Sequence, residues 1–311
     1  MGGRRDVHGF EAGYTISCAH FHLLGKSAAK HTEVWETVKQ FANPAEPPAL
    51  LTDFERASFG AAQRVFPGVD SGGCLFHLAQ SIDRKIAALG LQGKCNSDGE
   101  FKLRVKMLLG RAFLPPEEVV GAFVGMEPLF ADDEQECLGY FESTYIGRPA
   151  GAGRRPPLFP IRFWSVFGRH EHGALRTCNA VESFHNAFAT GLARAARPTI
   201  WAFLADLKRQ QNLTEKDIVD IEAGHVKTER KKERGRNERI ATLVSRYAEH
   251  NDAIRLRRGI AYNYLDAQTS QTKNRQKNVW RPKEIPTTPP NSDALQTLRA
   301  PRISLFGATR E

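Results

Sequence analysis

The spacing of hydrophobic positions over the first 65 residues changes back and forth between that of a strand and that of a helix. Residues 14–25 are rich in β-forming side chains and end in a glycine, which predicts a strand. Over residues 28–42 apolar side chains recur three or four positions apart, which predicts an amphipathic helix. A short apolar run at 49–52 predicts a buried strand, and helical spacing returns over 54–65. This order of elements favours an α/β sheet.

Beyond residue 70 the pattern becomes almost wholly helical. Apolar spacing predicts helices at 75–90, 100–113, 116–126 and 134–145. Glycine and proline predict a loop over 147–160. Further helices are expected to begin near Asn179, to run from 198 into the 220s, and to cover 240–265. Gln, Thr, Asn and Pro dominate residues 266–311, which we expect to form a disordered tail.

The charge and cysteine content of the chain indicate which binding partners and which compartment to expect. The chain has 311 residues, a formal net charge of +9 and a pI of about 9.4. A basic protein of this kind favours polyanionic partners, DNA above all. Its five cysteines do not follow the spacing of a small disulfide framework, which favours a reduced intracellular compartment. No apolar run approaches the roughly 20 residues of a membrane span, so no membrane partner is expected.

Asp53 directly follows the short apolar run at 49–52. A carboxylate at the end of a buried strand lies at the open end of an α/β sheet, where ligands bind. Two or three carboxylates gathered there can hold a pair of Mg²⁺ ions about 4 Å apart for phosphodiester cleavage. Asp is also a preferred helix N-cap, and a helix is expected to start here. The stretch alone leaves both interpretations open.

Two further pairs of residues have metal-binding chemistry. Glu182 and His185 are three positions apart on an expected helix, so they share a face suited to metal binding or phosphate chemistry. The alternative is a solvated Glu and a packed His. Cys74 and His77 form a CxxH pair, which is half of a zinc site, so a structural zinc module is one hypothesis. No second pair lies nearby in the sequence, and His20 with His22, or His170 with His172, could complete the site only through the fold. The alternative for Cys74 is a small buried residue at a helix end.

A basic run, KTERKKERGRNER at 227–239, has the charge expected of a phosphate-binding segment. Its composition also fits a nuclear import signal. Because acidic residues dilute the run, a solvated charged segment is the alternative. The residues expected to contact DNA are Arg176, Lys227, Arg230, Lys231, Lys232, Arg234 and Arg236.

Five sequence motifs follow one another along the chain. They are LLTDFERA, GCLFHLAQSI, LGYFESTYIGRP, PPLFPIRFWSVF and RTCNAVESFH. Together they resemble the Mutator-like element (MULE) transposase domain, as found in animal proteins of which some carry FLYWCH zinc fingers. The resemblance covers roughly residues 13–265 and rests on the ordered set, because each motif alone is unspecific.

The resemblance implies a ribonuclease H-like fold with a DDE site that cuts and joins DNA strands using Mg²⁺. Asp53 then corresponds to the second acid and Glu182 to the third, with a helical insertion at about 75–160 between them. Cys74 and His77 correspond to the CxxH pair of the family. The residues that match the motifs near the last acid are Trp164, Arg176, Thr177, Asn179 and His185, the last a candidate helper in catalysis.

The start of the chain departs from the family pattern. The first catalytic Asp should end a strand with the pattern apolar-apolar-Asp-Gly-Thr-Phe, and nothing here matches it. Asp6 is the only Asp before Asp53, and no apolar run precedes it. Residues 14–24 resemble the third strand of the family, so the first two strands are expected to be missing. The strand at 14–24 would then have unpaired edges or pair with the strand before Asp53.

The expected organisation is a flexible N-terminus (1–12), a partial transposase domain (13–205), a helical basic extension (206–265) and the tail (266–311). With one of three carboxylates absent, Mg²⁺ should bind poorly, and we expect a nuclear, DNA-binding protein that is catalytically incomplete. A domesticated, non-catalytic nucleic-acid-binding or regulatory protein is the main alternative. Homo-oligomerisation is expected by analogy with transposases.

Overall fold

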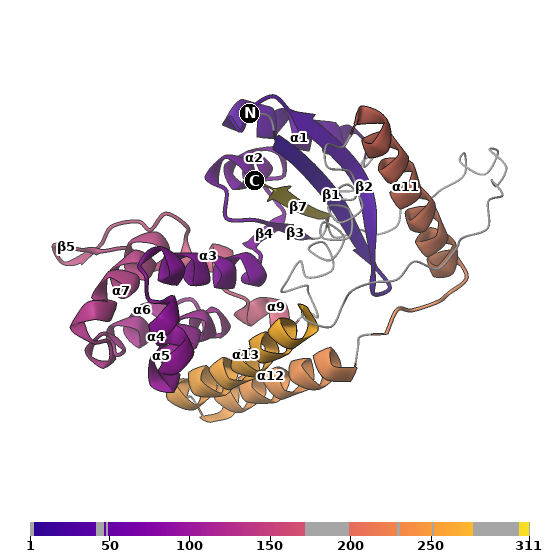
Figure 1. The fold of residues 1–311 in the computed structure, drawn as a ribbon. Helices are drawn as coiled ribbons and strands as arrows, with labels where there is room; N and C mark the ends of the chain where they lie inside the picture. Colours follow the sequence, from indigo (N-terminus) through magenta and orange to yellow (C-terminus); the bar gives the residue numbers. More distant parts are fainter. Residues whose placement is uncertain are drawn as a thin grey trace.

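We describe the protein from a computed structural model. The parts of the chain that the structure describes are residues 3–41, 47, 49–171, 199–228, 231–250, 252–275 and 305–310. Over these residues the protein is mixed α/β and mostly helical. Figure 1 shows a small sheet with helices against it and, beside this sheet, a body of helices.

A five-stranded sheet organises the first part. Its strands are β1 (Gly3–Glu11), β2 (Tyr14–Leu23), β3 (Ala49–Thr52), β4 (Asp70–Gly73) and β7 (Leu305–Arg310). They lie in the order β2-β1-β7-β3-β4. β1 pairs antiparallel with β2 and β7, whereas β3 pairs parallel with β7 and β4. The last described strand in the sequence therefore lies in the middle of the sheet (Figure 1).

The β1–β2 hairpin turns at Ala12 and Gly13, whose φ angles are 48° and 81°. Positive φ at both central residues is what a two-residue type I′ turn requires, and this turn matches the twist of a hairpin. A side chain at Gly13 is also excluded sterically, because its Cβ would lie 2.3 Å from the carbonyl oxygen of Lys227. The Lys227 N–H donates to the Ala12 carbonyl oxygen at 2.9 Å, so the segment after α11 (Ile200–Glu222) packs against the turn.

Two helices cover one face of the sheet. They are α1 (Ala28–Phe41) and α2 (Arg56–Val65). Trp35 of α1 is fully buried in a hydrophobic cluster that includes Val7 of β1 and Leu50 of β3. Its indole N–H donates to the Ser58 carbonyl oxygen at 3.3 Å, so the polar atom that Trp35 carries into the core is satisfied.

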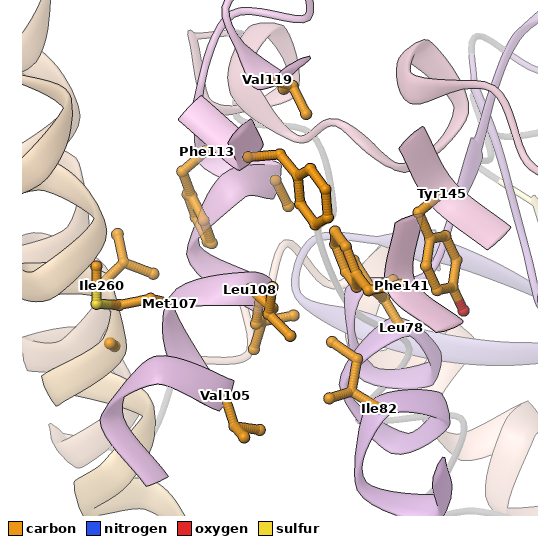
Figure 2. Packing of buried hydrophobic residues seen from close by; sticks show 14 of the residues in the cluster. Leu78, Ile82, Val105, Met107, Leu108, Phe113, Val119, Phe141, Tyr145 and Ile260 are labelled. Carbon is orange, nitrogen blue, oxygen red and sulfur yellow. The ribbon is translucent and has the colours of Figure 1, made fainter. Parts of the chain in front are cut away.

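A body of helices forms the second part. Its described α-helices are α3 (Leu75–Ala88), α4 (Gln92–Ser97), α5 (Gly99–Gly110), α6 (Val119–Val124), α7 (Gln135–Phe141), α8 (Ile161–Trp164) and α9 (Phe167–Glu171). Its short turns are η1 (Arg111–Phe113), η2 (Glu127–Leu129), η3 (Asp132–Glu134) and the π-helical η4 (Glu142–Ile146), with a ribbon of β5 (Pro149–Ala150) and β6 (Gly153–Arg154). Figure 2 shows the core of this body, in which Phe141 and Tyr145 lie near Leu78 of α3. The Tyr145 hydroxyl lies 2.6 Å from that of Ser81.

Two long helices pack against this body. They are α12 (Lys231–His250) and α13 (Ala253–Arg275). α13 lies along α5, and Figure 2 shows Ile260 beside Met107 in their interface. Arg111 and Arg257 are buried near the same interface, and both donate to the Ala122 carbonyl oxygen, at 2.8 and 2.7 Å. Burial and the nearby charge of Arg257 hold the pKa of Arg111 well below its ordinary value.

The sheet differs from the sequence expectations at four places. A flexible N-terminus was expected over 1–12, whereas Gly3–Glu11 forms β1. The strand expected at 14–25 is confirmed as β2, but it pairs with β1 and not with the strand before Asp53. β7 lies within the tail that was expected to be disordered. β4 has the sequence Asp-Ser-Gly-Gly, which contains no β-forming residue, so no pattern predicts it.

The helices of the structure agree better with the sequence expectations, although several begin or end at other residues than expected. The helix expected from 198 into the 220s is present as α11, and it runs across the expected domain boundary at 205. The pattern over 240–265 belongs to two helices, α12 and α13, and the charged run before it is mostly the start of α12. The second of these helices is capped by Asp252, whose carboxylate accepts from the Arg255 N–H at 2.9 Å. α13 continues to Arg275, inside the expected tail, and residues 276–304 lie outside the described ranges.

Candidate functional site

Asp53 follows the last residue of β3 and is buried, with 6% of its surface exposed. The next helix, α2, begins at Arg56 and has Glu55 as its N-cap residue. The N-cap interpretation of Asp53 is therefore wrong, because the helix begins too late for Asp53 to cap it. Asp53 instead lies at the carboxyl end of a parallel strand, which is where ligands bind in open α/β sheets.

Asp53 shares one face of the sheet with a second buried acid, Asp6. Val7 and Leu50 belong to the core beneath α1 and α2. Because side chains alternate along a strand, Asp6 and Asp53 are placed on the opposite face. Asp6 is 1% exposed. The face away from α1 and α2 thus carries two buried carboxyl groups.

The strand register places these two acids in one row. Asp6 pairs with Ala308 of β7, and the preceding Gly307 pairs with Thr52 of β3. The next residues along the two parallel strands are Ala308 and Asp53. Asp6 and Asp53 therefore flank the backbone of Ala308, and two strand spacings put their Cα atoms about 9–10 Å apart. We call Asp6, Ala308 and Asp53 the carboxylate row.

A chain of hydrogen bonds extends from the carboxylate row onto β2. His20 Nδ1 lies 2.7 Å from Asp6 Oδ1, and His20 Nε2 lies 3.1 Å from Ser17 Oγ. Ser17 and His20 share a face because a β-bulge at Cys18 adds one residue to β2 between them. The Asp6 carboxylate accepts from Nδ1, which orients the imidazole and directs Nε2 to the Ser17 hydroxyl.

The end of β4 lies next to the end of β3. The Cys74 N–H donates to the Thr52 carbonyl oxygen at 2.9 Å, and Cys74 is the buried N-cap residue of α3. His77 follows on the first turn of the same helix. This position agrees with the expectation of a small buried residue at a helix end.

Arg169 of α9 brings a positive charge to the same end of the sheet. Its guanidinium donates to the carbonyl oxygens of Gly73, at 3.1 Å, and Phe163, at 2.8 Å. It fills the space that a side chain would need at Gly72, where an added Cβ would lie 1.6 Å from the guanidinium. Arg169 is 9% exposed, so this charge lies inside the protein and one strand away from Asp53.

Several of the expected site residues lie outside the described ranges. They are Arg176, Thr177, Asn179, Glu182 and His185. The pairing of Asp53 with Glu182 therefore stays a prediction. Trp164 is described and is a core residue, because it is fully buried and its indole N–H donates to the Tyr145 carbonyl oxygen at 3.2 Å.

The described side chains do not by themselves form a metal site. Within the described ranges, no three His, Cys, Asp or Glu side chains gather closely enough to hold a metal ion. Asp53 offers the hard oxygen donors that Mg²⁺ prefers. The expectation of magnesium at Asp53 and Glu182, and that of zinc at Cys74 and His77, stay predictions.

The basic residues before and within α12 differ in their surroundings. Lys227 places its Nζ over the Tyr14 ring, 5.0 Å from the centroid, and so helps to hold the segment after α11 against the hairpin. Arg236 packs its guanidinium over the Tyr264 ring at 5.7 Å. These two basic residues have packing roles.

Two others present their charge to solvent. Lys231 and Arg234 are exposed on the first turn of α12. Arg234 lies 3.8 Å from Glu238, a contact between exposed groups that contributes little. Arg230 and the side chain of Lys232 lie outside the described residues.

Sequence reasoning did not identify Ser17, Asp6 or Arg169 as site residues, and it considered His20 only as a possible contributor to a zinc site. The signal for His20 was its alternation with His22 along an expected strand, which indicates that both lie on one face. Asp6 carried no such signal, because its burial depends on the long-range pairing of β1 with β7.

Comparisons with protein-family models, with curated protein sequences and with solved structures gave no match for this chain. Among the helices in the described part of the chain, none is long and apolar enough to cross a bilayer. The function is therefore inferred from the residues, the sheet and the geometry of the site.

Proposed function

We propose that this protein is a DNA-binding protein derived from a MULE transposase, with a ribonuclease H-like sheet and an incomplete catalytic site. The observation that carries the proposal is the strand order. In a ribonuclease H-like sheet the first two strands lie between the third and the fourth. Here β1 and β7 lie between β2, which resembles the third strand, and β3, which ends at Asp53.

The position of the helical body gives further support. The resemblance implies a helical insertion between the second and third acids, and the helices from α3 to α9 lie between Asp53 and Glu182 in the sequence. The CxxH pair also fits, because Cys74 and His77 lie at the start of the first of these helices. These features support the proposal of a MULE-type domain.

The incomplete site follows from the identity of the strand beside β3. This strand is β7, and its residues Leu305–Arg310 include no carboxylate. Ala308 therefore lies beside Asp53, where the first acid of the triad is expected. Bound Mg²⁺ would activate water and stabilise the leaving oxygen in phosphodiester cleavage, but carboxylates must hold it. We expect DNA binding without strand cleavage.

The binding half of the proposal is tested at Lys231 and Arg234. The variant Lys231→Ala/Arg234→Ala removes two exposed charges without touching the core. Each lost phosphate contact should lower the slope of log affinity against log salt by about 0.9 for duplex DNA. Fluorescence anisotropy with a labelled duplex at several salt concentrations measures this slope for the variant and the wild type.

The matched control is Arg148→Ala/Arg162→Ala, which removes the same charge from exposed positions on the helical body. It should retain the wild-type slope if α12 provides the contacts. Equal losses in both variants would assign the binding to net charge alone. Affinity that does not fall as salt rises would remove phosphate binding from the proposal.

The part of the proposal that concerns catalysis is tested by incubating the same protein with a labelled terminal-repeat duplex and MgCl₂ and measuring strand cleavage and strand transfer. We expect no strand cleavage or strand transfer in wild type or in Asp53→Asn. Cleavage by the wild type that disappears in Asp53→Asn would overturn the incomplete site, and it would leave the DNA-binding half intact.

A further inference from the structure

β7 fills a gap that is one strand wide. Its residues Arg310 to Phe306 pair with Arg4 to His8 of β1, and Leu305 to Gly307 pair with Leu50 to Thr52 of β3. Among the described strands, β1 has β2 and β7 as its only neighbours, and β3 has β7 and β4. Without β7 the sheet would separate into an antiparallel hairpin and a short parallel pair.

We propose that this gap is a strand-acceptor site and that the chain's own segment 305–310 is its ligand. The site lies between the facing edges of β1 and β3, and it accepts a strand that runs parallel to β3. Main-chain hydrogen bonds provide the affinity in such strand addition, and they do not depend on the side chains of the added strand. The inference stands independently of the proposed DNA binding.

The connection of β7 to the rest of the chain supports its role as a separable ligand. The other strand pairs of this sheet are made within the first 73 residues, and the β1–β2 turn has only two residues. β7 is joined to α13 through residues 276–304, a link of about 30 residues that can reach up to about 100 Å when extended. Because β7 belongs to the same chain, its pairing with β1 and β3 is intramolecular, which favours it over a free peptide.

Occupation of the gap also sets the geometry of the carboxylate row. Asp6 and Asp53 lie on the two strands that border the gap, and β7 fixes the spacing between them. The residue that the inserted strand places between the two acids is Ala308. The strand ligand therefore forms the floor of the candidate site as well as joining the sheet.

Amide hydrogen exchange in the full chain tests the proposal. The variant Ala308→Pro removes a backbone N–H from the middle of β7. Because β7 is a central strand, proline at this position should destabilise its pairing with the neighbouring strands. We expect amides of β1 and β3 to exchange at least about tenfold faster than in wild type. Amides of α5, in the helical body, should be unchanged.

The matched control is Gln296→Pro, which places the same residue in the link and outside β7. It should exchange like the wild type. Unchanged protection of both β1 and β3 in Ala308→Pro would show that β7 does not hold the sheet together, and would overturn the proposal.

A labelled peptide of residues 303–311 then tests the site as an acceptor. It should bind the full-length Ala308→Pro chain saturably and restore the protection of β1 and β3. It should bind the wild type at least about tenfold more weakly, because the tethered strand already fills the gap. Equal binding to the two chains, or no binding to the variant, would contradict an exchangeable strand.

Should Ala308→Pro also lose protection in α5, a disulfide provides a second measurement on an unbroken strand. Arg5 pairs with Thr309, so Arg5→Cys with Thr309→Cys places two thiols at cross-strand distance. We expect a bridge between them on mild oxidation, located by peptide mass mapping. The absence of a bridge between these two thiols would overturn the proposal.

Discussion

Arg169 and Gly72 occupy a space at the end of β4 that has room for only one side chain. The guanidinium lies where a Cβ on Gly72 would be, and it is held there by hydrogen bonds to Gly73 and Phe163. Any side chain at position 72 must displace a buried, charged group from its acceptors. The requirement for glycine here comes from a neighbour and not from the backbone, since Gly72 has no positive φ.

Gly72→Ala should therefore lower the free energy of unfolding by about 2–3 kcal/mol, the cost of losing hydrogen bonds to a buried charged group. Urea denaturation followed by circular dichroism measures the change. A matched control is Gly139→Ala in α7, where an added Cβ meets nothing within 4 Å. That variant should be neutral or stabilising by up to about 1 kcal/mol, as expected for Gly to Ala in a helix. Equal effects in the two variants would contradict the role of Arg169.

The two acids of the carboxylate row differ in how far the sequence predicts them as site residues. Asp53 was predictable as a site residue because the apolar run before it and the helix after it are both local patterns. Asp6 was not predictable, because only the register between β1 and β7 brings it into the row. The partner of Asp6 in that row is about 300 residues away along the chain.

At the scale of elements, Glu134 joins three pieces of the helical body. Its buried carboxylate accepts from Arg104 of α5 at 2.8 Å and from the Ala131 N–H at 3.1 Å, and it lies 2.9 Å from Lys94 of α4. Burial by itself raises the pKa of Glu134, but the hydrogen bonds from Lys94 and Arg104 outweigh it and hold the pKa below its ordinary value.

Low pH should therefore weaken the contacts that Glu134 makes with α4 and α5. A carboxyl group with a depressed pKa in the folded state stabilises the fold above its ordinary pKa of 4.5, and the contribution is lost as the pH falls through the lower, folded value. We expect Glu134→Gln to be less stable than the wild type by about 2–3 kcal/mol at pH 7. The difference should shrink as the pH falls below about 4.5, measured by urea unfolding across pH. A difference that does not change with pH would assign the loss to packing.

Helices were more predictable than strands for a physical reason. A helix such as α11 closes its hydrogen bonds within one segment, so its periodicity is present in the sequence. β4 consists of Asp, Ser and two glycines, and it is a strand only because β3 lies beside it. β7 likewise depends on partners on both sides, so its composition alone favoured disorder. The break between α12 and α13 was missed because apolar spacing continues across it.

At the scale of the whole molecule, Phe54 connects the sheet to the helical body. It directly follows Asp53, yet its ring packs edge-on against Tyr145, Phe159 and Phe163, with centroids 5.0 to 5.7 Å away. The two hydrophobic cores are separate clusters, one containing Trp35 and the other Trp164. Phe59 of α2 also packs against the second core, with its ring centroid 4.0 Å from that of Phe163. Phe54 thus makes the end of β3 part of the second core.

Phe54→Ala should therefore uncouple the unfolding of the two parts. With 5-fluorotryptophan incorporated, ¹⁹F NMR resolves Trp35 in the sheet core and Trp164 in the helical body. In urea we expect their signals to be lost together in the wild type and at separate midpoints in Phe54→Ala, which removes about 2–3 kcal/mol of packing. Phe41→Ala, which changes a residue of the same type that is 84% exposed, is the control. Coincident midpoints in Phe54→Ala would mean that other contacts couple the two parts.

The central place of β7 also decides the order in which this protein can fold during synthesis. β1, β2, β3 and β4 leave the ribosome early, but the strand that must lie between β1 and β3 follows only after α13. The contacts of β7 with β1 span nearly the whole sequence, so they close the longest loop and form slowly. Until then two strand edges stay unpaired, and unpaired edges promote aggregation. The helical body, whose contacts are more local, can be complete first, so the nascent sheet is the stage at which a chaperone would matter most.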